Sequence, residues 1–321
     1  MLRRLAIPIL VSAVTLAATA LVPGRTSAAF PQAAPATGSE GNAQRDSQAQ
    51  RPSEAEIRAR TKNVTDNQHR NDEALDQYER IERYVDRSGG SNPHTIEDHT
   101  YRVVPDGGGT IKLLLKDGNQ PADPTEYRQQ LQLLESVLET MAKPDDSRAK
   151  AAREKYEKRK RERAQFVDAA SEAYVANWVG RENYNGHACD VIELDPNPNF
   201  HPHSMFQAAL AHVSAKVWVD HQEDQIVRGE AHVLNDISFG GGILGKLYRG
   251  GIVSMEQAEV APGIWLPTRY QYDFAGRKFL FPFEQHQTID AGHYRRIGPP
   301  QEALAIVRNE LATGKPFSGD P

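Results

Sequence analysis

Apolar and polar side chains alternate along the second half of the chain, between residues 174 and 283. A period of two predicts β-strands with two different faces. The turns between these segments are too short for a parallel crossover, so neighbouring strands must run antiparallel. We therefore predict a mainly β (α+β) fold built on a large, curved antiparallel sheet. Its clearest predicted strands cover residues 174–179, 188–194, 215–219, 226–233 and 264–274.

The first half of the chain is predicted to be largely helical. A capping box, in which Glu56 follows Ser53 by three positions, marks the start of the first helix. Its apolar stripe is sparse at helical spacing: Ile57, Val64, Leu75, Tyr78, Ile81 and Tyr84. Residues 88–91 are expected to end this helix.

A predicted hairpin and three further helices complete the pattern. The two strands of the hairpin cover residues 99–104 and 110–115, on either side of a Gly-rich turn. The helices cover residues 126–141, 148–166 and 301–312. We expect one domain over residues 53–321, with a helical, charged insert at about 124–167.

The N-terminal residues have the layout of a secretory signal. Arg3 and Arg4 precede an apolar run over residues 5–22, and the small residues 27–29 favour cleavage near Ala29, before Phe30. An uncleaved membrane anchor is the alternative, because the run is near the minimum spanning length. Residues 30–52 have the composition of a disordered tether. The expected location of the mature protein is the periplasm.

Composition narrows the functional classes. The net charge of −5 gives no reason to expect a nucleic-acid partner. Cys189 is the only cysteine, so no internal disulfide forms. His201 and His203 are the residues best suited to begin a metal site or the active site of a hydrolase. The sequence shows neither the further metal ligands nor the nucleophile motif that such sites need. We therefore predict a protein that is not an enzyme and has no cofactor.

Two other segments have a simple and a functional interpretation. The charged helix at 148–166 carries nine Lys or Arg and three Glu, which would suit an anionic membrane surface or an envelope protein partner. The simpler interpretation is a solvated helix with i,i+4 pairs. The Gly-rich segment 240–247 resembles a phosphate-binding loop, but Leu247 replaces the required Ser or Thr. A flexible apolar loop that gates a cavity fits it better.

Three motifs resemble those of a known family. They are the strand and Asn-Gly turn at residues 179–187, the strand that ends in Trp-Val-Asp at 218–220, and Gly-Ile-Trp-Leu-Pro at 263–267. The series resembles the LolA/LolB-like superfamily of periplasmic lipoprotein carriers, and is most similar to its outer-membrane lipoprotein-sorting-like branch. The resemblance covers residues 170–295 well and 75–165 loosely. The chain is longer than the carriers, and their cavity arginine has no match here.

The resemblance implies an antiparallel half-barrel wrapped round lid helices, with an apolar cavity for acyl chains. The predicted function is a periplasmic, non-enzymatic carrier or binding protein for lipid or acylated protein. A lipid-sensing or protein-binding regulatory module of the cell envelope is the alternative. The residues expected at the lid or mouth are Phe206, Phe239, Ile243, Leu244 and Leu247. Those expected to line the cavity wall are Trp218, Trp265, Tyr270, Tyr272 and Phe274.

Overall fold

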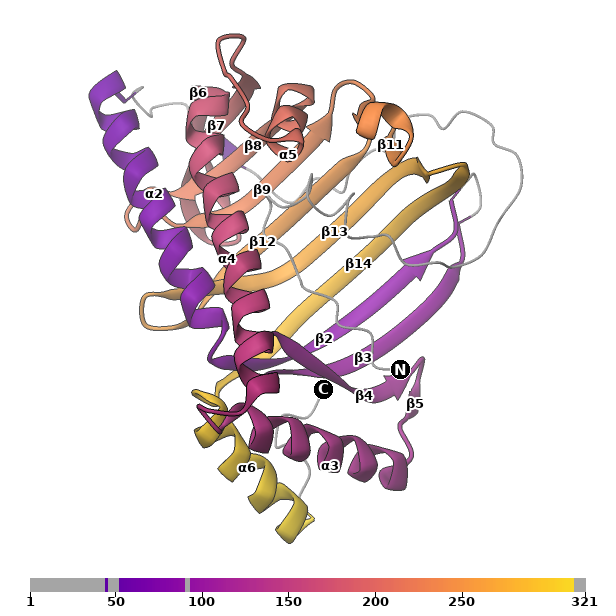
Figure 1. Ribbon diagram of the computed structural model, residues 1–321. Coiled ribbons are helices and arrows are strands. Elements are labelled where there is room, and N and C mark those ends of the chain that lie inside the picture. The colour runs from indigo at the N-terminus through magenta and orange to yellow at the C-terminus, as the bar shows by residue number, and fades with distance from the viewer. Residues whose placement is uncertain (1–43, 46–51, 90–92, 315–321) are drawn as a thin grey trace.

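The computed structural model describes residues 44–45, 52–89 and 93–314. Within them, one antiparallel sheet of 14 strands curves across the molecule (Figure 1). The predicted curved half-barrel of the α+β class is confirmed. The strands are β1 (Gln44–Arg45), β2 (Tyr78–Arg87), β3 (Thr95–Pro105), β4 (Thr110–Asp117), β5 (Gln120–Pro121), β6 (Tyr174–Tyr184), β7 (His187–Pro196), β8 (Val213–Asp220), β9 (Ile226–Val233), β10 (Ile237–Phe239), β11 (Gly245–Leu247), β12 (Ile252–Ala261), β13 (Ile264–Lys278) and β14 (Phe281–Arg296).

The strand order explains why helices cross the sheet. Along its main path the order is β1-β6-β7-β8-β9-β12-β13-β14-β2-β3-β4-β5, with β10 and β11 attached to β13. Because β5 and β6 are far apart on this path, the chain between them must traverse the sheet. It does so through α3 (Pro124–Met141) and α4 (Ser147–Ala173). The 27 residues of α4 span about 40 Å.

The remaining helices lie on two sides of the sheet (Figure 1). Helix α4 crosses the face towards the viewer, which we call the inner face, and α2 (Glu54–Leu75) lies beside it along the margin of the sheet. Helix α6 (Pro300–Thr313) packs beside α3 against β3 and β4. Short turns are α5 (Met205–Ala208), η2 (Ala209–His212) and η3 (Gly240–Gly242).

The first predicted helix is partly wrong. Its capping box at Ser53 and Glu56 is present, but α2 ends at Leu75. Tyr78, Ile81 and Tyr84 belong to β2 instead. Both faces of β2 are largely buried, so its sequence lacks the alternation that identifies a half-exposed strand.

Most other sequence predictions are confirmed in type, with shifted ends. The hairpin β3–β4 and helices α3, α4 and α6 are present, although α4 extends to Ala173. The Asn185-Gly186 turn has φ of 50° and 88°, as a tight hairpin requires. Two residues of the segment expected to be disordered, Gln44–Arg45, pair with β6. Residues 1–29, where the signal is predicted, lie outside the described residues.

Candidate functional site

A continuous row of aromatic side chains lies on the inner face. Tyr270 stacks on Tyr272 at 6.2 Å between ring centroids, Tyr272 meets Phe274 at 6.4 Å, and Phe274 meets Phe283 at 6.2 Å. The first three are buried, in one cluster with Phe166 of α4. Alternation along β13 brings them to one face. The row therefore forms an aromatic track along β13, with Phe283 of β14 at its half-buried end.

Helix α2 is fixed to the sheet by polar side chains. Arg60 bonds to Asp190 and, at 2.6 Å, to Asp224. Asn67 donates to the carbonyls of Glu223 and Asp224 at 3.0 and 2.8 Å. The buried Asn71 donates to Gln225 at 2.9 Å and accepts from the amide of Trp265 at 3.1 Å. The expected apolar stripe is thus not what attaches this helix.

Asp190 anchors this polar contact surface. Burial alone would raise the pKa of its carboxyl, but hydrogen bonds from His221, Trp178, Arg60 and Arg181 outweigh burial and hold the pKa at about 2. The carboxylate is therefore charged at any neutral or mildly acidic pH. It joins β6, β7 and the β8–β9 turn to α2.

Polar groups also join α2 to α4. Asp76 accepts hydrogen bonds from Tyr156 and, at 2.9 Å, from Lys160. His69 lies 3.2 Å from Asp168. Burial raises the pKa of Asp72 to about 6, and Arg163 only partly offsets the effect. These polar bonds join the two helices to each other, while Phe166 and Ala173 attach α4 to the apolar cluster of the inner face.

The surplus cations of α4 are largely used within the molecule. Arg153 donates to the carbonyls of Met141, Lys143 and Pro144, and Arg159 donates to Gly108 at 3.4 Å. Between residues 154 and 162 the exposed positions balance in charge: Glu154, Lys155, Glu157, Lys158, Arg161 and Glu162. The basic composition of this helix is thus in large part structural.

A buried ionic group adjoins the aromatic row. Glu82 is 1% exposed and accepts hydrogen bonds from Arg80, at 2.7 Å, and from Tyr84. Lys112 lies 3.6 Å from the same carboxylate and 3.8 Å above the Tyr84 ring. Burial opposes the charge on Glu82, but Arg80 and Lys112 outweigh burial and lower its pKa.

These residues escaped the sequence analysis because β2 was read as part of a helix. At helical spacing, Arg80 and Glu82 look like ordinary solvent-facing charges. The aromatic and β-branched content of Tyr78–Arg87 was the available signal for a strand.

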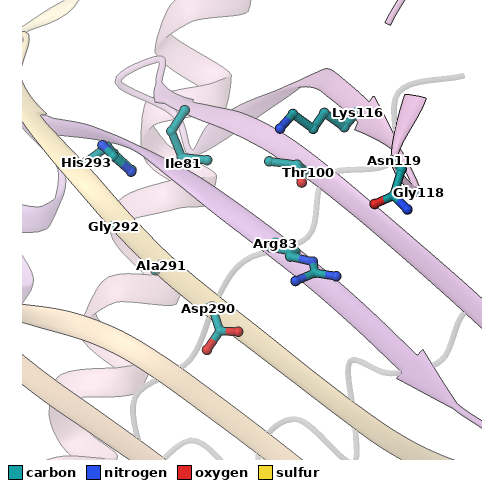
Figure 2. A pocket seen from close by; sticks show the side chains of 10 residues that line it. All are labelled: Ile81, Arg83, Thr100, Lys116, Gly118, Asn119, Asp290, Ala291, Gly292 and His293. Carbon is teal, nitrogen blue, oxygen red and sulfur yellow. The ribbon is translucent and has the colours of Figure 1, made fainter. Parts of the chain in front are cut away.

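An open pocket lies on the other face of the sheet, between β14, β2, β3 and the β4–β5 turn (Figure 2). Its volume is about 430 Å³. Arg83 projects into it but is already bonded to Asp98 at 2.9 and 2.6 Å, and Asp290 is bonded to Arg269 at 2.7 Å. The charges of Arg83 and Asp290 are therefore satisfied by neighbours. The pocket is lined by Ile81, Arg83, Thr100, Lys116, Gly118, Asn119, Asp290, Ala291, Gly292 and His293.

The structure separates the predicted site residues into three groups. Tyr270, Tyr272, Phe274, Phe239 and Leu247 share the buried inner cluster. Trp218 and Trp265 belong to a different cluster, with Tyr184, Cys189, Val191 and Val227. Ile243 and Leu244 are exposed. The side chain of Phe206, in α5, lies outside the described part of the structure.

The remaining segments that the sequence suggested as sites show few features of a binding or catalytic site. The Gly-rich segment forms η3 and the short strand β11, and the positive φ of Gly240, Gly241 and Gly242 explains the glycines of η3. In the described residues, no three His, Cys, Asp or Glu side chains come together as a metal site. No helix of that part of the chain has the length and apolar character needed to cross a membrane.

The comparisons with known proteins give structural likenesses only. No family model and no curated protein matches the chain. Solved structures similar to it include members of the LolA superfamily. One is a LolA superfamily protein from Nitrosomonas europaea, with 10% identity, a TM-score of 0.30, and coverage of 77% of this chain and 96% of that chain.

Two further structures are similar at the same level. An outer membrane lipoprotein-sorting protein domain from Vibrio parahaemolyticus has 8% identity and a TM-score of 0.29, covering 77% of this chain and 99% of that one. A DUF1329 family protein from Desulfovibrio piger has 14% identity and a TM-score of 0.25, covering 74% and 92%. The descriptions of the first two structures name the superfamily and the branch that the sequence motifs resemble.

Proposed function

We propose that this protein is a non-enzymatic, exported carrier or binding protein that takes an acyl-chain ligand on the inner face of its half-barrel. The observation that carries the proposal is the aromatic row from Tyr270 to Phe283, which packs against α4, a helix that polar bonds join to α2. An acyl chain placed on such a surface gains about 0.8 kcal/mol for each CH₂ removed from water. Phe239 and Leu247 border the row within the same cluster.

The polar attachment of α2 and α4 supports a lid role for these helices. When a helix bound by Arg60, Asn67 and Asn71 moves away, its hydrogen-bonding groups are solvated at once. An apolar helix face would instead expose hydrophobic surface at a large cost. Movement of α2 is therefore less unfavourable than movement of an apolar helix, whereas movement of α4 also exposes Phe166 and Ala173, which are buried in the same cluster as the row. Residues 53–321 would act as one domain, delivered to the periplasm by the N-terminal signal.

Native mass spectrometry of the purified mature protein tests the proposal. We expect a phospholipid or acylated peptide at about one molecule per chain. An empty protein that also fails to bind a fluorescent fatty-acid probe would contradict the proposal. It would then favour the alternative of a protein-binding regulatory module.

A pair of variants localises the ligand. Phe283→Ser shortens the aromatic row at its half-buried end, so we expect about tenfold weaker probe binding. Val175→Ser changes an exposed side chain on β6 and should leave binding unchanged. Thermal melts of both variants verify that they fold. Equal binding by both variants would place the ligand away from the row.

A further inference from the structure

An exposed apolar knob protrudes where two segments meet at one end of the sheet. Leu280 is 86% exposed, Ile243 75% and Phe281 63%, and Phe279 and Leu244 are about half exposed. The amide of Phe279 donates to the carbonyl of Leu244 at 3.2 Å, and Gly245 pairs with Lys278. These contacts bring the β13–β14 turn beside the Gly-rich loop. We call these five residues the tip.

The backbone of the tip is held in an unusual conformation. Phe279 has φ of 52°, in the left-handed region that bulky residues rarely occupy. Arg277 donates to its carbonyl at 2.8 Å and thereby fixes the turn. Strain of this kind persists where the surroundings enforce it, and it often marks a functional surface. Here the turn presents Leu280 and Phe281 to solvent instead of folding them inwards.

Charge around the tip identifies the partner. The two segments that build it, residues 236–249 and 277–284, carry four cations and two carboxylates: Lys246, Arg249, Arg277 and Lys278 against Asp236 and Glu284. One of the carboxylates, Asp236, is already paired with Lys246 at 2.7 Å. Apolar side chains that protrude among surplus cations fit an anionic phospholipid surface, which accepts both features.

The tip is continuous with the aromatic row. Phe281 and Phe283 lie two positions apart on β14 and point to the same face. Phe283 then contacts Phe274, whose neighbour is Tyr272. An acyl chain that leaves a bilayer at the tip would meet apolar side chains all the way to the inner face.

We propose that the tip docks this protein on anionic phospholipid membranes, by inserting Leu280, Phe281 and Ile243 into the interface. The site is distinct from the basic helix, since β11 and its loop lie at the opposite end of the sheet from the start of α4 (Figure 1). The inference does not depend on the proposed ligand of the inner face.

Sedimentation with vesicles of equal parts phosphatidylglycerol and phosphatidylcholine tests the docking, using the full mature chain. We expect wild type to bind these vesicles, with weaker binding to pure phosphatidylcholine or in high salt. Leu280→Asp should bind about tenfold more weakly, which corresponds to about 1.4 kcal/mol. Leu133→Asp, at an exposed position on α3, is the matched control and should bind as wild type does.

Several results would overturn the proposal. Among them are wild type that does not bind the anionic vesicles, Leu280→Asp that binds as well as wild type, and loss of binding on charge reversal of Lys158 and Arg161 alone. A concentration-dependent dimer abolished by Leu280→Asp would assign the tip to a second copy of this chain instead. Binding of a soluble fatty-acid probe by Leu280→Asp distinguishes failure of docking from failure of the carrier function.

Discussion

Glu82 is the single carboxylate between two buried cations of the inner face, which makes Glu82→Gln a sharp perturbation. The substitution keeps the volume but leaves the charges of Arg80 and Lys112 without compensation, at 3% and 12% exposure. Breaking a buried ion pair by removing one partner costs about 3–5 kcal/mol. We expect a loss of this size in the free energy of unfolding, and a melting temperature lower by roughly 10 °C.

Urea denaturation followed by circular dichroism measures the effect. Glu97→Gln, at an exposed carboxylate on the neighbouring strand β3, is the control and should change stability by less than about 0.5 kcal/mol. The double variant Glu82→Gln/Arg80→Met removes one of the stranded cations. It should therefore be more stable than Glu82→Gln alone. A loss below about 1 kcal/mol for Glu82→Gln would refute the reasoning, because it would mean that water solvates Arg80 and Lys112.

Two further predictions concern the helix pair and the sheet. Because the folded pKa of Asp72, about 6, lies above its ordinary 3.8, its stabilising contribution is complete below pH 3.8 and is lost as pH rises through 6. Asp72→Asn should thus raise stability by up to about 3 kcal/mol at pH 7 and little at pH 4, as measured by urea denaturation at both pH values; an equal effect at both would exclude this cause. Gly276→Ala would place its Cβ 2.5 Å from the Lys246 carbonyl, so we expect a loss of about 1–3 kcal/mol, whereas Gly292→Ala, with nothing within 4 Å, should cost less. Equal melting temperatures for the two alanine variants would contradict the close packing of β11 on β13.

The strands in which apolar and polar residues alternate were predictable, because this alternation indicates both an extended conformation and which side chains are buried. Tyr270, Tyr272 and Phe274 alternate with polar residues, and the structure places them together on the inner face. The sequence could not separate Trp218 and Trp265 from this group, because both also lie in strands. Their assignment to another cluster depends on packing between strands far apart in the chain.

The parts that sequence reasoning missed share a physical cause. Arg80, Glu82, Asn67 and Asn71 are polar residues that are buried because they satisfy one another or a distant strand. Their low hydropathy predicts that such residues lie at the surface. They can be buried because residues brought close by the fold satisfy their hydrogen-bonding groups. The Gly-rich loop was recognised as apolar. Its contact with the β13–β14 turn, which creates the tip, joins residues that no local pattern connects.

The pairing of β2 with β14 has a consequence for how the chain acquires its structure. Tyr84 pairs with Ile289, so a strand near the beginning of the domain hydrogen-bonds to one near its end. During synthesis the N-terminal part of the chain appears first. One edge of β2 therefore lacks its hydrogen-bonding partner until nearly all of the domain has followed. Contacts of such long sequence separation slow folding and leave strand edges exposed to aggregation. Chaperone protection of β2 and β3 during synthesis would therefore matter more for this protein than for a sheet of sequential hairpins.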